Sequence, residues 1–389
     1  MNDVVVIDAV RTPIGSFGGT LKSLAATDLG AITIGDLFKS NSLNPDYIDE
    51  VVMGNVLSAG LGQAPARQAA LRAGLKNTTP CTLCDSGMSA VMIAMHAIQA
   101  GDAGVMIAGG MESMSNVPLY TTGSRFAAKI GHAKLQDGII KDGLSDSFKH
   151  FLMGNAAELC ARTHAITRQD QDDYAARSYK QALNARENGL LQNEISRVKI
   201  RNSKRQAEII LTDEEIDRFD GEKLTRLPPE FEKEGTITAA NASPLSDGAA
   251  SLLLMSASRA QQLGCKPAAR LVSQANAAQA TEWFTTSPSK AMARAIDRAK
   301  KNVSDIDLFE VDEAFAIVPL ITAKLLNIDI EKVNTHGGSL SLGNPIGCTG
   351  ARLLVTLFHS LRAHDRQWGC AGACLGGGGA AAMVMERIE

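Results

Sequence analysis

The sequence predicts a mixed α/β fold, because short buried runs alternate with amphipathic stretches along most of the chain. Six runs rich in Val, Ile, Ala and Gly are typical of buried strands. They begin at Val4, Glu50, Ala103, Ala268, Asp307 and Gly369. Helical patterns lie between them, for example at 28–40 and 287–302. A chain of 389 residues is too long for one ordinary core, so we expect at least two lobes.

The two halves of the chain echo each other. Ser86, Gly87 and Ser89 begin a Gly/Ser-rich helix pattern, and the strand pattern after it ends in AGGMES. In the second half, the helix pattern that begins near Gly343 precedes a strand pattern ending in GGGGAAA. The echo suggests two similar lobes whose Gly-rich loops meet. The alternative is that βαβ units look alike in general.

The middle of the chain, from about 118 to 240, is more polar and more highly charged than either half. It contains a helical pattern at 168–189 and a basic, strand-like run at 197–211. We therefore predict an insertion that crosses between the lobes, not a flexible linker. The expected domains are an N-terminal lobe of 1–117 plus 247–267, an inserted loop domain of 118–246, and a C-terminal lobe of 268–389.

The composition narrows the possible partners. Hydrophobic residues make up 45% and charged residues 21%, as in folded proteins. A net charge of -3 gives no reason to expect nucleic acid or an anionic membrane as partner. No apolar run is long enough to span a bilayer, and no targeting signal is recognisable. Together with seven cysteines, read as reduced thiols, these features predict a cytoplasmic protein.

The stretch PCTLCDSGMSAVMIAMHAIQAG, which begins at Pro80, carries two cysteines three positions apart. Cys81 and Cys84 could form a redox pair or a zinc half-site, fill the core, or supply a nucleophile. A zinc site needs a second ligand pair, and none follows at suitable spacing, so we expect no metal. Cys84 stands just before an amphipathic helix pattern, whose positive end lowers a thiol pKa and favours thiolate. A buried, unreactive thiol is the alternative for Cys84.

A third cysteine, Cys374, opens into four glycines in GACLGGGGAA. Backbone N–H groups in such a loop can bind an oxyanion or a phosphate. The alternative is a tight turn in which only glycine fits. The Gly run on its own does not decide between an anion-binding loop and a tight turn. The presence of two candidate cysteines, Cys84 and Cys374, favours a reactive site.

Four segments together resemble the thiolase family of acetyl-CoA acetyltransferases and 3-ketoacyl-CoA thiolases. They are TLCDSGMSA from Thr82, VDEAFA from Val311, HGGSLSLGNPIGCTGAR from His336 and CLGGGGAAA from Cys374. The resemblance covers essentially the whole chain, in order. It implies a five-layered αβαβα thiolase fold with the loop domain over the active site. It also implies a homodimer or a homotetramer.

The resemblance implies an acyltransferase of the acetyl-CoA C-acetyltransferase type, with acyl-CoA and CoA as substrates and no bound cofactor. The reaction would be reversible thiolysis of a 3-oxoacyl-CoA or Claisen condensation of two acyl-CoA molecules. Cys84 resembles the acyl-accepting nucleophile and Cys374 the acid/base. Backbone N–H groups of Cys84 and Gly376 would form the oxyanion hole. The residues that match substrate contacts are Leu144, Met153, Ser243 and Phe315.

The chain differs from the usual thiolase pattern at two positions of the catalytic motifs. Thiolases usually have Gly-His-Pro where this chain has Asn344 between Gly and Pro, and an Asn side chain cannot take up a proton at neutral pH. Loss of a positioned base typically costs about 10²–10⁴-fold in rate. Asp312 replaces a usual Asn. We therefore hypothesise that Asp312 takes the Cys84 proton that the histidine would take.

Two further positions differ: Cys81 replaces a usual Asn, and Leu152 replaces a frequent His. We expect Cys81 to be a packing residue, and Leu152 makes the pocket more apolar. The alternative function is a thiolase-like protein that binds CoA esters with weak or no catalysis, because its base is missing.

Overall fold

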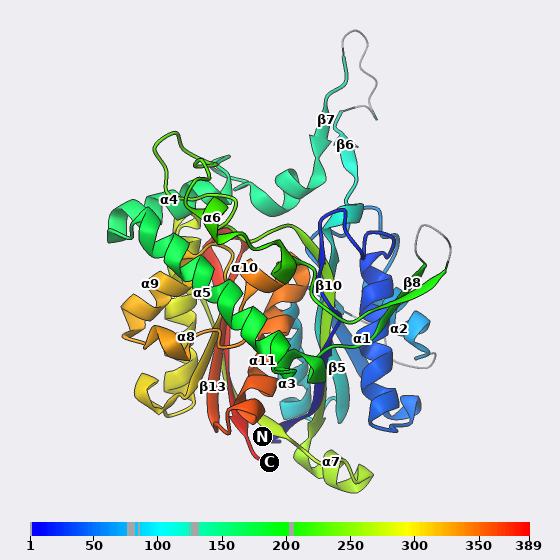
Figure 1. Cartoon of the computed structure of the whole chain (residues 1–389). Helices are drawn as coiled ribbons and strands as arrows, with labels where there is room; N and C mark the ends of the chain where they lie inside the picture. The colour runs from blue at the N-terminus through cyan, green and yellow to red at the C-terminus, as the bar shows by residue number, and fades with distance from the viewer. Residues whose placement is uncertain (1, 76–81, 85, 124, 126–131, 202–205) are drawn as a thin grey trace.

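The computed structural model describes residues 2–75, 82–84, 86–123, 125, 132–201 and 206–389. Its centre is a ten-stranded mixed sheet in the order β12-β13-β14-β11-β1-β10-β5-β3-β4, with β2 paired to β10 (Figure 1). The strands are β1 (Val4–Arg11), β2 (Gly15–Ser16), β3 (Glu50–Gly54), β4 (Thr82–Cys84), β5 (Val105–Ser113), β10 (Ser246–Ser256), β11 (Ala269–Ala278), β12 (Leu308–Val311), β13 (Trp368–Leu375) and β14 (Gly379–Arg387).

The strands alternate their side chains between two apolar layers, which is why nearly continuous Val, Ile and Ala runs form them. In β1, Val4 and Val6 belong to a central core, whereas Val5 belongs to an outer core. In β14, Met383 and Met385 point to the same central core, and Val384 points to a second outer core. Each half of the sheet is therefore buried on both faces.

Helices fill these three cores and produce five layers (Figure 1). The outer layer on the N-terminal half contains α1 (Ala26–Ser40) and α2 (Pro65–Ala73). The central layer contains α3 (Gly87–Ala100) and α11 (Ile346–Ala363). The outer layer on the C-terminal half contains α8 (Ser287–Arg298) and α9 (Ile317–Leu326). The predicted αβαβα arrangement is confirmed.

The two central helices approach so closely that glycine is required between them. A Cβ on Gly350 would lie 2.6 Å from the backbone nitrogen of Met88, and one on Gly87 would lie 2.9 Å from that of Ala351. Distances below about 3 Å do not occur for real Cβ atoms. The first turn of α3 therefore lies directly against the first turns of α11, and the two Gly-rich helix starts meet as the echo predicted.

The two halves of the sheet join where β1 pairs with β11. This antiparallel pairing covers only Val4 to Val6, opposite Leu271 to Ala269. On the N-terminal side, β1 and β10 are antiparallel, while β3 is parallel to both β4 and β5. On the C-terminal side, β12 runs parallel to β13.

The inserted segment is locally helical, as predicted. Thr167 caps the helix expected at 168–189 with its side chain, which accepts from the Asp170 backbone N–H. The strand-like run at 197–211 forms a hairpin, and a second hairpin projects from the body (Figure 1). The elements are β6 (Leu119–Thr121), β7 (Leu135–Asp137), η4 (Ile140–Leu144), α4 (Met153–His164), α5 (Arg168–Glu187), β8 (Val198–Arg201), β9 (Ala207–Ile210) and α6 (Gly221–Leu224).

Short elements complete the described chain. They are α7 (Ala257–Leu263), α10 (Ser339–Leu342), η1 (Pro45–Tyr47), η2 (Met114–Asn116), η5 (Leu190–Asn193), η6 (Glu215–Arg218), η7 (Thr281–Thr286), η8 (Val303–Asp305), η9 (Ile330–Lys332) and η10 (Gly376–Gly378).

Two expected strands differ from the structure. The run that begins at Gly369 is two antiparallel strands, β13 and β14, because the glycines of η10 turn the chain between them. The run from Asp307 is a strand only to Val311. Asp312 still donates its backbone N–H to the Gly372 carbonyl of β13, while the carboxylates of Asp312 and Glu313 accept side-chain hydrogen bonds from Ser339 and Ser178.

Candidate active site

Two segments from different parts of the C-terminal lobe meet at the end of β13. Cys374 is the second-last residue of that strand, and its thiol donates a hydrogen bond to Asp312 Oδ2 at 2.9 Å. The Asp312 backbone N–H donates to the Gly372 carbonyl at 3.0 Å, so the loop after β12 continues alongside β13. The structure thus brings together two predicted site residues that are 62 positions apart.

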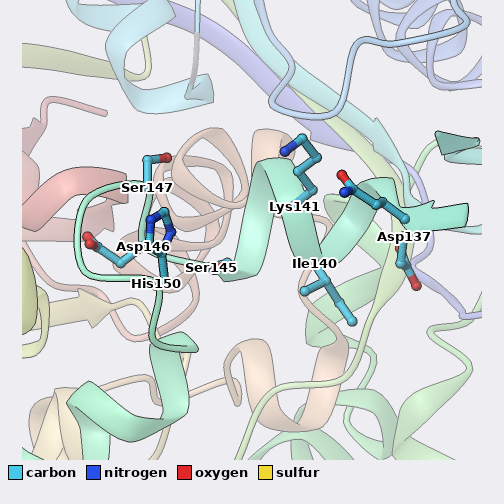
Figure 2. A pocket seen from close by; sticks show the side chains of 8 residues that line it. Asp137, Ile140, Lys141, Ser145, Asp146, Ser147 and His150 are labelled. Carbon is cyan, nitrogen blue, oxygen red and sulfur yellow. The ribbon is translucent and has the colours of Figure 1, made fainter. Parts of the chain in front are cut away.

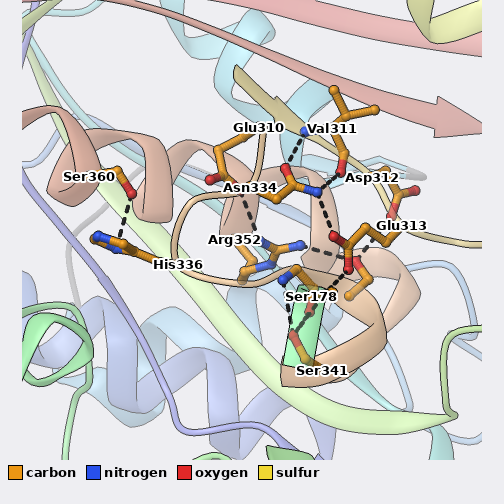
Figure 3. Close-up of polar contacts among 12 residues, drawn as sticks. Ser178, Glu310, Val311, Asp312, Glu313, Asn334, His336, Ser341, Arg352 and Ser360 are labelled. Carbon is orange, nitrogen blue, oxygen red and sulfur yellow. Dashed lines mark hydrogen bonds and ion pairs between the residues drawn. The ribbon is translucent and has the colours of Figure 1, made fainter. Parts of the chain in front are cut away.

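Asp312 is held on its other oxygen as well. Ser339 Oγ donates to Asp312 Oδ1 at 3.1 Å, and Arg352 Nη2 donates to Ser339 Oγ at 3.0 Å (Figure 3). The carboxyl group is buried, with 5% of the residue exposed, and this burial raises its pKa. Burial and the neighbouring Asp312 carboxylate raise the pKa of the Cys374 thiol well above its usual value. The thiol form of Cys374 is therefore favoured at neutral pH.

Glu313 fixes the loop that carries Asp312. Its buried carboxylate accepts hydrogen bonds from Tyr174 Oη at 2.8 Å, Ser178 Oγ at 2.8 Å and Asn334 Nδ2 at 2.7 Å. It also accepts from the Leu340 backbone N–H at 3.0 Å. Four donors from three other segments leave the carboxylate little freedom, so Asp312 is presented on a rigid support. Figure 3 shows two of these donors, Ser178 and Asn334, at the Glu313 carboxylate.

Asn344 lies just before α11 and has its side-chain amide engaged at both ends. Its Nδ2 donates to Ser243 Oγ at 2.7 Å, and its Oδ1 accepts from the Thr349 hydroxyl. Ser243 Oγ in turn donates to the Ala314 carbonyl at 3.0 Å. This chain of bonds ties the loop before α11 to the loop of Asp312. An Asn amide has two N–H donors, and Ser243 accepts one of them.

The predicted substrate residues lie on two sides of this centre. Met153, Phe315 and Cys374 belong to one apolar cluster, where the ring of Phe315 meets Phe231 edge-on with centroids 6.0 Å apart. Leu144 packs in a separate cluster with two neighbours of Asn344, Leu245 and Ile346. The fourth predicted residue, Ser243, bonds to Asn344 itself.

The glycines after Cys374 form an open cradle. A Cβ on Gly376 would meet no heavy atom within 4 Å, so its backbone is accessible to a ligand. Gly377 adopts a φ of +69°, which favours glycine. The Gly378 carbonyl accepts from Ser287 Oγ at 2.7 Å and from the Gln279 backbone N–H at 3.0 Å, which anchors the turn.

Cys84 is described by its backbone. It is the last residue of β4, opposite Gly54 of β3. Ser86 caps the following helix α3 by accepting from the Met88 N–H at 3.3 Å. The strand therefore delivers Cys84 to the start of α3, which lies against the first turns of α11 just after Asn344. The side chain of Cys84 and all of Cys81 lie outside the described residues, so their predicted roles stay predictions.

A hollow of about 400 Å³ lies in the inserted segment, next to Leu144 in sequence (Figure 2). Its lining consists of Gln136, Asp137, Ile140, Lys141, Ser145, Asp146, Ser147 and His150. Among the described residues, Cys374, Asp312 and Asn344 do not line it, so this hollow is separate from their cluster. In the described part of the chain, no group of His, Cys, Asp and Glu could hold a metal ion.

Sequence reasoning missed the buried charges that support the site. Arg352 and Ser339 sit behind Asp312, and Glu112 joins three segments on the other side. The Glu112 carboxylate accepts from Asn55 Nδ2 at 2.6 Å and from the Gly347 backbone N–H at 3.0 Å. Burial raises its pKa to about 7. The sequence did offer one signal for Glu112, because it is a charged residue near the end of the otherwise apolar strand β5.

Comparisons with known proteins agree with this geometry. Residues 4–258 match the thiolase N-terminal domain, and residues 265–387 match the thiolase C-terminal domain. Acetyl-CoA acetyltransferase 2 of Arabidopsis thaliana is 48% identical over 99% of this chain and 97% of its own length. The mitochondrial acetyl-CoA acetyltransferase of Rattus norvegicus is 46% identical over 100% of this chain and 92% of its own.

Solved structures share the fold over the full length. The Bacillus anthracis acetyl-CoA acetyltransferase has a TM-score of 0.97 and 36% identity, covering 100% of this chain and 99% of its own. The Acat5 thiolase of Ascaris suum, solved in complex with coenzyme A, has a TM-score of 0.93 and 37% identity, covering 99% and 100%. Within the described residues, no helix is both long and apolar enough to cross a membrane. The chain belongs to the thiolase family, and the thiolase fold expected from its motifs is confirmed.

Proposed function

We propose that this thiolase is an acetyl-CoA C-acetyltransferase that makes or cleaves acetoacetyl-CoA through an S-acetyl-Cys84 intermediate. The observation that carries the proposal is full-length similarity to proteins named acetyl-CoA acetyltransferase, at 43–48% identity, with both cysteines in place. The arrangement of Cys374, Asn344 and the open glycine turn at one end of the C-terminal lobe supports it.

In the first half-reaction, the Cys84 thiolate attacks the thioester carbon of acetyl-CoA, and the bond from that carbon to the CoA sulfur breaks. Cys374 gives its proton to the leaving CoA thiolate and takes up the proton that Cys84 lost, so Cys374 ends the step as a thiol. Backbone N–H groups of Cys84 and Gly376 stabilise the oxyanion that forms at the thioester oxygen. The position of Cys84 just before the N-terminus of α3 lowers the free energy of its thiolate, because that end of the helix carries partial positive charge.

In the second half-reaction, Cys374 removes a proton from the methyl carbon of a second acetyl-CoA. The resulting enolate attacks the acetyl group on Cys84, giving acetoacetyl-CoA and free Cys84. The enolate oxygen needs a hydrogen-bond donor, and Asn344 supplies one: the Nδ2 hydrogen that Ser243 does not accept. Asn344 thus keeps the donor function of the usual histidine, while its base function is lost.

The substrate is held by the inserted segment and the C-terminal lobe. CoA, which the Ascaris suum thiolase binds in its solved structure, would place its pantetheine arm beside Ser243 and Leu144 in this chain. Met153 and Phe315 give the acyl group an apolar wall. We propose no resident cofactor, a cytoplasmic location, and a homodimer or homotetramer.

The second candidate function is a protein that binds CoA esters without turning them over. Asn344 is the observation that favours it, because the family's base is absent there. A protein that only binds CoA esters does not need a cysteine hydrogen-bonded to a carboxylate, as Cys374 is to Asp312, so we prefer the enzyme.

Thiolysis of acetoacetyl-CoA by CoA separates the two functions. We expect turnover in the wild type and loss of turnover in Cys84→Ala and Cys374→Ala. Cys265→Ala should keep full activity, because Cys265 is a half-buried thiol two residues after the end of α7. Binding of CoA in all four proteins with no turnover in any of them would favour the binder. Turnover that persists in Cys84→Ala would refute the covalent route.

A further inference from the structure

The two half-reactions of acetyl transfer and condensation do not use the contact between Asp312 and Cys374. In the family pattern the residue at 312 is a neutral Asn. Here a carboxylate accepts a hydrogen bond from the Cys374 thiol, with the sulfur and oxygen 2.9 Å apart. A carboxylate oxygen at this distance can take that proton, which an Asn amide oxygen cannot do at neutral pH. The substitution therefore places a proton acceptor directly behind the acid/base cysteine.

Two groups favour the charged form of this carboxylate against its burial: Ser339 as a hydrogen-bond donor and Arg352 as a positive charge. Arg352 of α11 is linked to Asp312 through Ser339, and the same Arg352 lies 3.4 Å from Glu310 of β12. Glu313 is the other charged neighbour, and its negative charge opposes ionisation of Asp312. Arg352 thus shares its positive charge between Glu310 and Asp312, so an additional thiolate charge on Cys374 is costly.

We propose that Asp312 and Cys374 act as one proton-relay pair, in which Asp312 is a positioning residue that takes the cysteine's proton while Cys374 takes the substrate's. The proposal rests on the acetyltransferase function above and concerns its second half-reaction. The hypothesis that Asp312 takes the proton of Cys84 stays a prediction, because the side chain of Cys84 lies outside the described residues.

The relay moves two protons in one step. The C–H bond of the acetyl-CoA methyl group breaks, its electron pair stays in the enolate, and its proton forms a new S–H bond on Cys374. The original S–H bond breaks at the same time, and its proton forms an O–H bond on Asp312 Oδ2. The single negative charge of the pair moves to the enolate, and no thiolate accumulates beside the carboxylate.

Two pH profiles test the relay. We expect Asp312→Asn to lower the deprotonation midpoint of Cys374 and to move the rising limb of the condensation rate to higher pH. The first profile is thiolate absorbance, measured as the difference between each enzyme and the same enzyme with Cys374→Ser. Removal of the neighbouring carboxylate should lower the deprotonation midpoint of Cys374 by about 1–3 pH units, since a like charge disfavours the thiolate.

The second profile is the rate of acetoacetyl-CoA formation from acetyl-CoA. In the wild type the pair can accept a proton as soon as Asp312 is ionised. In Asp312→Asn the base must be a free Cys374 thiolate, so the rising limb of the rate should move to higher pH. A residue with only a structural role would not move the two profiles apart.

Asp305→Asn is the matched control, since Asp305 is an exposed carboxylate in the turn before β12. It should leave both profiles unchanged. If Asp312→Asn does not fold, Ser339→Ala supplies a second test. Loss of the donor to Asp312 Oδ1 disfavours the ionised carboxylate, so the Cys374 midpoint should fall and the rising limb of the rate should move to higher pH.

Identical thiolate profiles for the wild type and Asp312→Asn would refute the coupling between Asp312 and Cys374. Profiles that move in the same direction would overturn the relay. Condensation that is absent from every enzyme, including the wild type, would refute the proposed function instead, while the thiolate titration would still report on the pair.

Discussion

At the scale of single residues, Asn344 decides what kind of catalyst the site can be. Its amide is oriented by Ser243 on the nitrogen and Thr349 on the oxygen, so one N–H points along a fixed direction. A preorganised donor stabilises a developing oxyanion more than water does, because it needs no reorganisation during the reaction. The residue is therefore suited to support an enolate and unsuited to remove a proton.

Asn344→Ala removes this donor and leaves the hydroxyls of Ser243 and Thr349 without their partner. We expect kcat for condensation to fall by about 10²–10³-fold, the usual cost of one oxyanion-hole donor. Steady-state kinetics with acetyl-CoA check this, with Asn193→Ala on the exposed η5 turn as the control. A kcat within a few-fold of wild type would mean that Asn344 does not contact the reacting oxygen.

At the scale of elements, the packing of α3 against α11 sets the position of the nucleophile relative to Asn344. Both residues lie just before the start of a central helix, and glycines allow the two helix starts to touch. Glu112 at the end of β5 reinforces the junction, because its carboxylate accepts from the N–H of Gly347 in α11 and that of Val56 after β3. Catalytic geometry in this fold thus depends on backbone contact between two helices.

Gly350→Ala tests that contact. The added Cβ would lie 2.6 Å from the Met88 backbone nitrogen, so the helices must move apart. We expect the free energy of unfolding to fall by about 1–3 kcal/mol, the usual range for overpacking, together with a loss of acetyl transfer. Urea denaturation and the thiolysis assay measure the two effects.

Gly35→Ala in α1 is the matched control, because its Cβ would find neighbours only at 3.5 Å and beyond. There we expect equal or higher stability, by up to about 1 kcal/mol, since alanine loses less backbone entropy on folding. Equal stability of Gly350→Ala and wild type would show that the helices separate without cost.

At the scale of the whole molecule, the α/β fold was predictable because it depends on patterns that a single chain displays. The alternation of strand and helix patterns predicted the α/β class, and the two Gly-rich helix starts predicted two similar lobes whose loops meet. The five layers followed from the resemblance to thiolases, not from these patterns. The support behind the site was not predictable. Arg352, Ser339 and Asp312 are distant in sequence, and no local pattern reveals that a buried charge has found its partners.

The predicted homodimer or homotetramer belongs to this scale too. Leu119 and Leu135 on the projecting β6–β7 hairpin are 59% and 65% exposed, which suits contact with a second copy of the chain. We expect light scattering to give two or four times the 41.1 kDa chain mass. The pair Leu119→Asp and Leu135→Asp should lower that mass, whereas Leu325→Asp, at a leucine 49% exposed on α9, should not. An unchanged mass in the double variant would show that the hairpin is not an interface.

The most direct test of the account is the mass of the intact protein after incubation with acetyl-CoA, followed by peptide mapping. We predict one acetyl group per chain, attached to Cys84, in the wild type and in Asp312→Asn, and none in Cys84→Ala. Acetyl on Cys84 would establish that the first half-reaction proceeds with Asn344 in place of a base. Unmodified Cys84 at every pH tested, with an acetyl group appearing only in Asn344→His, would contradict the central claim and leave a CoA-ester binder in its place.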